Sequence, residues 1–340
     1  MSDHLILLAP SSNRVYAGSA DRLVAAELAI LLHSGEGTAP QIEPVTLAGV
    51  RYLRLGVPEL DEAAHAGLAR LSALFAVFRR DGEQLVPVTV SPPDLFDDDL
   101  VTIPKYPGKT NEQFTRLLLN VTLAAVTRPA AGSGRAVLDP LCGRGTILSS
   151  GLTLGHDVAG VEADVKAVEA YAAFLKTYLR RHRYKHTATM SPVRREGKSL
   201  GRRLDVEVSP DGTRALKLTV FTGDTRQSAE LYGKRTFDAV VTDAPYGVVH
   251  GSHTDVRGTS GKRDRSPAGL IGDALPVWAG QLKPGGALGL SWNTFGLTRE
   301  RLTEMATDAG LVPCLDGPWL SFGHRVDSAI SRDLFVAVKA

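Results

Sequence analysis

The stretch that decides the fold is Ala136-Val-Leu-Asp-Pro-Leu-Cys-Gly-Arg-Gly-Thr146. Its first four residues predict a strand that ends at Asp139. Two glycines follow, and residues without a side chain let the backbone turn sharply and approach a ligand closely. The residues from 145 to 154 predict a helix, whose free N–H groups favour an anionic group such as a carboxylate. A strand, a glycine turn and a helix in this order predict a ligand site at the carboxyl edge of an open α/β sheet.

The alternation continues after this stretch. Further strands are predicted at 158–162, 216–221, 237–243 and 286–292, and helices at 165–179, 267–282 and 298–309. Alternating strands and helices predict an α/β fold with a mostly parallel, doubly wound sheet. Two last strands, near 311–315 and 334–338, are joined without a helical pattern and predict an antiparallel terminal hairpin.

Residues 1–99 predict a separate small α+β domain. Strands are expected at 5–8, 50–55 and 85–90, and helices at 20–32 and 60–78. The pattern leaves the topology open, and a ferredoxin-like arrangement is one option. The Pro- and Asp-rich segment 91–99 predicts a linker to a second domain, 100–340. There Thr110-Asn-Glu-Gln113 fits a capping box at the start of a helix.

Composition narrows the class of protein. The chain has 340 residues, of which 43% are hydrophobic, so a disordered protein is excluded. No apolar run reaches the roughly 18 residues of a membrane span. Only Cys142 and Cys314 are present, which excludes a disulfide framework and a cysteine metal cluster, and we expect a cytoplasmic location. Residues 1–100 carry a net charge of −7 and the remaining residues +9, so the two parts present different surfaces.

Two nucleotide-binding motifs are excluded, and an acidic residue at a strand end remains as a candidate ribose contact. A dinucleotide fingerprint needs glycine at position 148, which is Leu, and a P-loop ending at Thr110 needs glycine at position 103, which is Ile. The next strand ends at Glu162, where an acidic side chain can bind ribose hydroxyls.

A second chemical signal ends the strand at 237–243. It reads Asp243-Ala-Pro-Tyr246. The Asp243 carboxylate and the Ala244 carbonyl can accept hydrogen bonds from the N–H groups of an aromatic amine and so localise its lone pair. Pro245 makes the turn rigid, and Tyr246 can stack on a base. This chemistry needs neither a metal nor a covalent cysteine.

These motifs resemble a known family. Residues 139–147 are similar to the S-adenosylmethionine loop of class I methyltransferases, in the D-P-x-C-G-x-G-T form of the RNA and DNA amino-methyltransferases. Residues 243–246 resemble the [DNS]-P-P-[YFW] tetrapeptide of enzymes that methylate exocyclic nitrogens. Residues 105–114 and 324–328 resemble segments of the THUMP-associated tRNA guanine-N2 methyltransferases. The resemblance covers about residues 100–340 and implies a Rossmann-like class I methyltransferase domain.

The resemblance also implies roles. S-adenosylmethionine would be held at its methionine end by the 139–146 loop, at its ribose by Glu162 and at its adenine by Asp224. The implied cofactor contacts are Thr110, Phe114, Asp139, Cys142, Gly143, Gly145, Thr146, Glu162 and Asp224, and the implied catalytic residues are Asp243, Ala244, Pro245 and Tyr246. Position 244 departs from the family, which has Pro there: the carbonyl is kept and the turn loses rigidity.

A basic insertion near 180–213 interrupts the resemblance. Its candidate phosphate contacts are Arg180, Arg181, Arg183, Lys185, Arg194 and Arg195. A solvated, disordered insertion fits the same residues. The loop 250–265 follows Tyr246 and is either a substrate-gating lid or a connection.

The implied function is methylation of an exocyclic nucleobase nitrogen, first of all guanine N2 in tRNA. The alternatives are a DNA adenine-N6 or cytosine-N4 methyltransferase and a non-catalytic protein that binds S-adenosylmethionine or RNA. The acidic N-terminal part has little room for a complete THUMP domain. The sequence leaves open the modified nucleotide and the oligomeric state.

Overall fold

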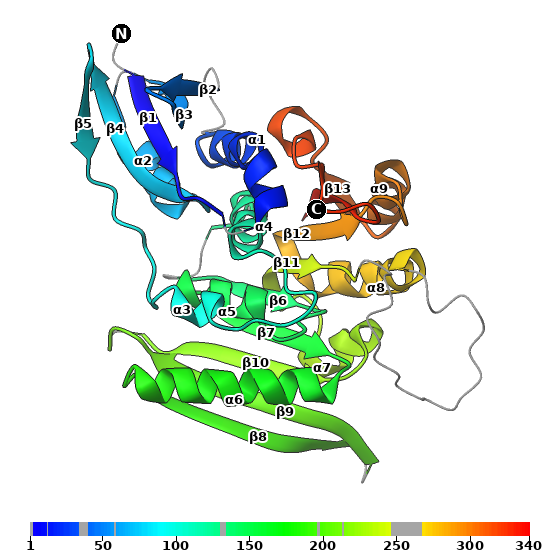
Figure 1. The fold of residues 1–340 in the computed structure, drawn as a ribbon. Coiled ribbons are helices and arrows are strands. Elements are labelled where there is room, and N and C mark those ends of the chain that lie inside the picture. The colour runs from blue at the N-terminus through cyan, green and yellow to red at the C-terminus, as the bar shows by residue number, and fades with distance from the viewer. Residues whose placement is uncertain are drawn as a thin grey trace.

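The computed structural model describes residues 3–11, 13–33, 40–57, 59–129, 134–195, 198–212, 214–245 and 267–340, which form two sheets with helices around them (Figure 1). The smaller sheet is antiparallel and has the strand order β2-β3-β1-β4-β5. Its elements are β1 (Asp3–Leu8), α1 (Arg14–Leu31), β2 (Gln41–Leu47), β3 (Val50–Gly56), α2 (Glu62–Arg70), β4 (Leu74–Asp81) and β5 (Gln84–Val88).

The larger sheet has the order β13-β15-β12-β11-β6-β7-β10-β9-β8, with β14 beside β15. Its strands are β6 (Ala136–Asp139), β7 (Asp157–Glu162), β8 (Lys185–Arg195), β9 (Lys198–Ser209), β10 (Leu216–Thr222), β11 (Phe237–Asp243), β12 (Leu282–Asn293), β13 (Leu311–Pro313), β14 (His324–Arg325) and β15 (Ser331–Lys339). The strands β10, β7, β6, β11 and β12 are parallel, and β15 runs antiparallel to β12 and β13. The predicted α/β class is therefore confirmed.

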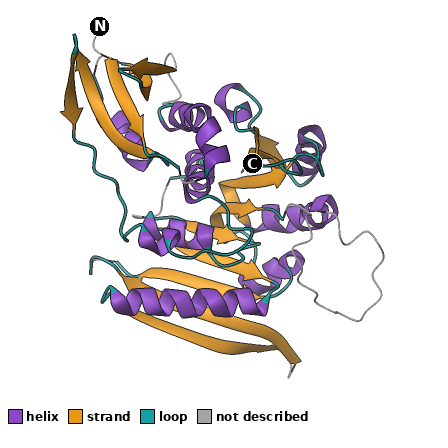
Figure 2. Cartoon of the chain, viewed as in Figure 1, coloured by secondary structure: helices purple, strands orange, loops and turns teal. Residues whose placement is uncertain are grey.

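Helices cover both faces of the larger sheet (Figure 2). One hydrophobic cluster joins it to α4 (Glu112–Ala124), α5 (Thr146–Thr153) and α6 (Val165–Arg181). The other joins it to α8 (Pro267–Gln281) and α9 (Arg299–Asp308). The described residues also form four short helical segments: α3 (Asp99–Thr102), η1 (Thr225–Gln227), α7 (Ser228–Tyr232) and η3 (Gly317–Leu320). Within the described residues, no helix has the length and apolar character that crossing a membrane requires.

Helix α1 belongs to two cores at once. Val24 and Leu28 pack in the core of the smaller sheet. Leu23 and Ile30 pack in the cluster that contains α4. Helix α1 thus joins the core of the smaller sheet to the core that contains α4 by burying a different face in each.

The prediction of one helix over 60–78 is wrong. Helix α2 ends at Arg70, the next residue Leu71 has an extended ψ of 134°, and β4 begins at Leu74. Apolar residues at three- and four-residue spacing fit a helix, but residues 76–78 are extended and pair antiparallel with residues 5–7 of β1. The capping prediction is also wrong, because the side chain that caps α4 is Asn111, which accepts the Phe114 N–H at 3.0 Å.

The insertion near 180–213 forms a hairpin rather than a loop. Strands β8 and β9 pair along their length, and β9 pairs with β10, so the hairpin extends the larger sheet at its edge. One face of the hairpin packs on α6 through Leu204, Val206 and Val208. The hairpin is therefore anchored in the core.

Candidate active site at the carboxyl edge of the larger sheet

A cavity of about 120 Å³ lies where β6 and β11 end. Because parallel strands end at the same edge of a sheet, the turn after β6 and the last residue of β11 meet there. The lining residues come from three stretches of the chain: Tyr106, Gly108, Thr110, Thr115 and Leu118; Asp139, Leu141, Cys142, Gly143, Arg144, Thr146 and Ile147; and Asp243.

Asp139 is the buried carboxylate of this cavity. Only 2% of it is exposed. Its Oδ1 accepts the Thr242 hydroxyl at 2.9 Å and the Leu141 N–H at 3.1 Å. Burial raises the pKa of Asp139 to about 7, and the carboxylates of Glu162 and Asp243 act in the same direction, while the two hydrogen bonds oppose the shift. A positively charged ligand would therefore be strongly favoured beside Asp139.

Both glycines of the turn adopt left-handed backbone conformations, which favour glycine over other residues. Gly143 and Gly145 have φ values of +51° and +77°. A Cβ at Gly145 would lie 2.4 Å from the Tyr171 ring, whereas a Cβ at Gly143 would meet nothing within 4 Å. Gly145 is thus required for packing, and Gly143 leaves open space beside the N-terminus of α5.

Glu162 is tied to the same turn. One carboxylate oxygen accepts the Gly143 N–H at 2.9 Å and the other accepts the Asp164 N–H at 2.8 Å. Burial raises the pKa of Glu162 despite these hydrogen bonds. The carboxylate therefore lies at the end of β7, beside the turn that Asp139 opens.

The segment 105–110 lies across the cavity. Tyr106 Oη is 2.6 Å from the Thr146 hydroxyl, and the Arg144 guanidinium lies over the Tyr106 ring, 5.1 Å from its centre. At the other end of the segment, the Thr110 hydroxyl donates a hydrogen bond to the Asp243 carboxylate. The segment thus links the glycine turn to the end of β11.

Ala244 follows Asp243 at the strand end. Its N–H donates to the Ser291 carbonyl at 2.8 Å, and 1% of the residue is exposed. A proline here would lack this donor. Pro245 is exposed, and Tyr246 lies outside the described residues.

Four of the predicted cofactor contacts do not line this cavity. Gly145 and Glu162 adjoin its glycine turn, whereas Phe114 and Asp224 lie elsewhere. Phe114 is fully buried and packs edge to face with Tyr16 and His324, while the Arg332 guanidinium lies over its ring at 4.8 Å. Asp224 lines a separate cleft of about 570 Å³ between η1 and the β8–β9 hairpin. The Arg226 guanidinium pairs with Asp224 at 2.7 Å and lowers the pKa of this carboxyl.

Asp224 and Glu162 still lie at the ends of neighbouring strands. Thr222 of β10 pairs in parallel with Glu162 of β7, so Asp224 lies just beyond the same edge.

Cys142 lines the cavity, and only 5% of it is exposed. Burial raises the pKa of its thiol well above the ordinary value, which keeps the sulfur protonated.

The predicted phosphate contacts are split between two edges. Lys185 pairs with Ser209 near the start of β10, whereas Arg194 pairs with Ser199 beyond its end. The eleven-residue strand β8 separates them by about 30 Å. Arg180, Arg181 and Arg183 precede β8, at the end of α6, so they lie with Lys185 at the edge opposite the cavity.

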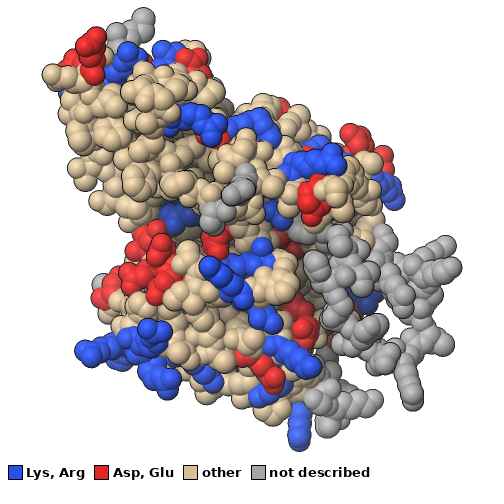
Figure 3. Space-filling view, in the orientation of Figure 1, with Lys and Arg blue, Asp and Glu red and all other residues tan. Residues whose placement is uncertain are grey.

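The face in Figure 3 accordingly shows Lys and Arg in scattered groups, with Asp and Glu between them. The Arg195 side chain and the loop 250–265 lie outside the described residues. Among the predicted phosphate contacts with described side chains, Arg194 lies at the carboxyl edge of the sheet, where it lines the separate cleft that contains Asp224.

The sequence reasoning missed several residues at this edge. Tyr106, Arg144, Thr115 and Leu118 line the cavity. The first two lie within the 105–114 and 139–147 motifs, which could have indicated them, whereas Thr115 and Leu118 lie on α4 beyond the first motif. Phe295, which follows β12, is also missed although 62% of it is exposed.

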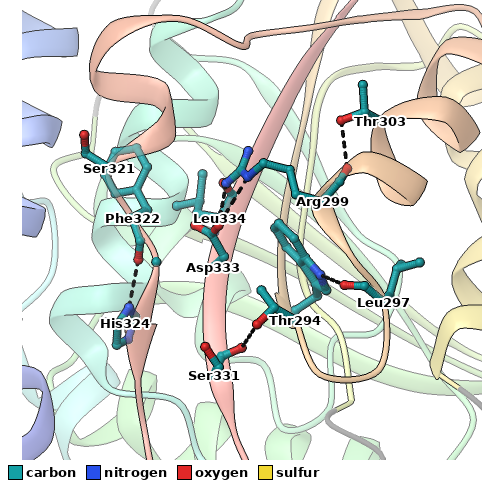
Figure 4. A network of polar contacts seen from close by, with 12 residues as sticks. Thr294, Leu297, Arg299, Thr303, Ser321, Phe322, His324, Ser331, Asp333 and Leu334 are labelled. Atoms are coloured by element: carbon teal, nitrogen blue, oxygen red, sulfur yellow. Dashed lines mark hydrogen bonds and ion pairs between the residues drawn. The ribbon is translucent and has the colours of Figure 1, made fainter.

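The turn that carries Phe295 is held firmly. Asn293 Oδ1 accepts the N–H groups of Phe295 and Ser331, at 3.2 and 3.1 Å. Thr294 bonds to the Ser331 carbonyl through both its N–H, at 2.7 Å, and its hydroxyl, at 3.1 Å (Figure 4). The same figure shows Arg299 on Asp333, at 2.7 Å. An aromatic side chain is therefore displayed to solvent from a rigid turn at the carboxyl edge.

No protein-family model matches the chain, and no curated protein matches it. Solved structures do resemble it. The structure of TrmN from Thermus thermophilus is 15% identical, with 100% of each chain covered and a TM-score of 0.47. A putative RNA methyltransferase from Pyrococcus horikoshii is also 15% identical, with 72% of this chain and 90% of that one covered, at a TM-score of 0.41. A TehB-like SAM-dependent methyltransferase from Corynebacterium glutamicum, 15% identical, covers 64% of this chain and 85% of its own at a TM-score of 0.34.

Proposed function

We propose that this protein is an S-adenosylmethionine-dependent methyltransferase that acts on an exocyclic amino nitrogen of a nucleobase, first of all guanine N2 in tRNA. The observation that carries the proposal is the single cavity that Asp139, Gly143 and Asp243 share. The glycine turn proposed to bind the cofactor therefore lies beside the Asp243 carboxylate, which is proposed to accept a hydrogen bond from the target amine.

The residues present fit the cofactor. Its methionine end carries an ammonium, a sulfonium and a carboxylate. Asp139, Glu162 and Asp243 make the cavity electronegative, which suits the two cations, as the raised pKa of Asp139 indicates. The open space at Gly143 and the N-terminus of α5 suit the carboxylate. The ribose would lie toward Glu162 and the adenine toward the edge that ends in Asp224.

The chain's own contribution to the reaction is positioning. When bound, the cofactor supplies an electrophilic methyl group. Asp243 accepts an N–H bond of the target amine, and the Ala244 carbonyl accepts the second, so the nitrogen lone pair is localised and directed to the methyl carbon. Thr110 holds the Asp243 carboxylate for this contact. The nitrogen then loses one proton, for which Asp243 is the nearest base of the proposed site.

Mass spectrometry of nucleosides tests this proposal. The full chain would be incubated with methyl-labelled S-adenosylmethionine and, separately, with unmodified tRNA, rRNA and duplex DNA. Labelled N2-methylguanosine in tRNA alone is expected, together with its loss in Asp243→Ala and its retention in Asp308→Ala, a matched change at the exposed end of α9. Label in DNA adenine or cytosine would replace tRNA as the substrate. No label in any nucleic acid, with cofactor binding intact, would refute the proposal.

A further inference from the structure

A group of arginines lies at the edge of the larger sheet opposite the cavity. Arg70 ends α2, Arg135 precedes β6, and His156 precedes β7. The main chain of Arg70 is fixed on α4, because its carbonyl accepts Arg116 Nε at 3.2 Å and Asn120 Nδ2 at 2.6 Å. This contact places Arg70, which belongs to the N-terminal part of the chain, beside the larger sheet.

His156 brings an unused donor to this group. Only 8% of the residue is exposed. Its Nδ1 accepts the Arg135 N–H at 3.3 Å, so the proton of the neutral ring is on Nε2. Among the described residues nothing accepts a hydrogen bond from that buried Nε2. Buried donors are nearly always paired, and an orphan of this kind calls for a ligand or a water.

The charges around His156 are positive. Burial, together with the charges of Arg70, Arg135 and Arg214, lowers the pKa of His156 to about 4, and the carboxylate of Asp238 opposes this shift. The ring is therefore neutral at pH 7, and its Nε2–H faces an environment in which an anion would be stabilised.

The arginines around His156 differ in whether a carboxylate pairs with them. Arg214 pairs with Asp157 at 2.6 Å, Arg116 with Asp94 at 2.7 Å, and Arg128 with Asp238 at 3.2 Å. Within the part of the chain that the structure describes, neither Arg70 nor Arg135 has an acidic partner at ion-pair distance. Residues 130–133, just before Arg135, are Ala-Ala-Gly-Ser and contain no acid.

Arg70 is also largely buried. Burial lowers its pKa, as do its neighbours Arg116 and Arg135, and only Glu27 acts against this. Two like charges that are partly withdrawn from water oppose folding. Their juxtaposition is therefore better explained by a binding role than by a contribution to stability.

We propose that Arg70, Arg135 and His156 form a binding site for a phosphate group. Guanidinium groups present paired N–H donors that match phosphate oxygens, and the His156 Nε2–H adds a neutral donor. Resting on the proposed function, the phosphate is one of the RNA backbone, bound at a point remote from the target base. The site joins α2 to the larger sheet, so it also gives the N-terminal part of the chain a role in holding the substrate.

Thermal unfolding of the full chain in inorganic phosphate tests the site without reference to activity. Wild type, Arg70→Gln, Arg135→Gln and Arg51→Gln would be compared in phosphate and in chloride at equal ionic strength. Arg51 is the matched control, since it is exposed and paired with Asp21. Phosphate should raise the unfolding temperature of wild type and Arg51→Gln, and not that of the other two, which in chloride should be at least as stable as wild type. Equal shifts in all four proteins, or none in wild type, would overturn the proposal.

The source of the phosphate is tested by tRNA binding as a function of salt. Each lost backbone contact should reduce the slope of log K against log[salt] by about one. Reduced slopes in Arg70→Gln and Arg135→Gln, but not in Arg51→Gln, support the RNA backbone. Phosphate protection with unchanged slopes would overturn the RNA source and assign the site to a free phosphate. Neither the unfolding measurement nor the tRNA-binding measurement requires methyl transfer. Both would therefore still test the phosphate site if the proposed activity were absent.

Discussion

The hydroxyl of Thr110 donates a hydrogen bond to the carboxylate of Asp243, which lies 133 residues further along the chain. The bond joins the segment that crosses the cavity to the end of β11. In the proposed reaction it fixes the oxygen atoms that the target amine must meet, so Thr110 is a positioning residue.

Thr110→Val tests this relationship. Valine keeps the shape and removes the donor, so kcat should fall about tenfold or more while cofactor affinity changes little, since alignment is lost rather than binding. Thr110→Ser restores the hydroxyl and should restore most of kcat. Steady-state kinetics and calorimetric titration of the cofactor separate the two effects. A loss confined to cofactor affinity would assign Thr110 to binding instead.

Cofactor affinity should depend on pH through Asp139. Its pKa in the free protein is about 7, and the proposed cationic ligand needs the ionised form. Affinity should therefore be level above pH 7 and fall by up to about tenfold per pH unit below it. Titration calorimetry between pH 5.5 and 8.5 measures this.

Asp139→Asn is the control for that dependence. The amide has no charge to lose, so the variant should bind weakly and with little change over the same pH range. A level affinity in wild type down to pH 5.5 would show that Asp139 does not face a cation.

Ala244→Pro should be harmful although it restores the residue that the tetrapeptide family has. The substitution removes the N–H that donates to Ser291 at 2.8 Å and leaves that carbonyl without its partner. A loss of about 1 kcal/mol in the free energy of unfolding is expected, measured with urea. Ala244→Gly keeps the donor and serves as the comparison. Increased stability in Ala244→Pro would contradict this account of the strand end.

Phe295 should contribute to binding of a nucleobase next to the proposed site. Its rigid turn makes stacking inexpensive in conformational entropy, and stacking on an aromatic side chain is worth about 1–3 kcal/mol per base. Phe295→Ala should raise KM for tRNA about tenfold and leave cofactor affinity unchanged. Phe75→Ala is the matched control, because Phe75 is 67% exposed on the smaller sheet. Equal effects of the two substitutions would remove any special role for Phe295.

Glu27 should make the protein less stable as the pH rises toward 7. The carboxyl is fully buried between α1 and α4, where it accepts Ser72 N–H at 3.1 Å and Asn120 Nδ2 at 2.7 Å, and burial raises its pKa from 4.5 to about 7. The contribution of Glu27 to the free energy of unfolding is complete below pH 4.5. It is lost as the pH rises to 7, by up to about 1.4 kcal/mol per pH unit.

Urea unfolding of wild type and Glu27→Gln at pH 5, 6, 7 and 8 isolates this contribution. Asp139 acts in the same direction in both proteins and His156 in the opposite one, so the difference between the two curves belongs to Glu27. That difference should change steadily from pH 5 to 7. Parallel curves would show that Glu27 has an ordinary pKa.

The larger sheet was largely predictable. Strands β6 and β11 begin and end where the sequence places them, because buried parallel strands are continuous apolar runs between polar turns. The hairpin β8–β9 was not predictable as strands. Its outer face carries Thr187, Thr189 and Ser191, and its many basic residues hide the alternation that anchors it on α6.

The candidate site was predictable only in part. Asp139, Gly143 and Asp243 follow strands, and strand ends gather at one edge by the rules of the fold. Tyr106 and Thr115 reach the same cavity because a loop and a helix pack across it, and no periodicity in a single sequence reports such packing. Phe114 shows the reverse case, since its helix presents it to the core and not to the cavity.

Helix α1 has a consequence for how the chain folds. Its Leu23 and Ile30 complete the core around α4, and Glu27 bonds to Asn120 across that contact. Cutting the chain at residue 99 would strip α4 of this cover and expose apolar surface. The two sheets are therefore expected to unfold in one cooperative transition, and the 241 residues after the cut are expected to aggregate rather than to act as an independent catalyst.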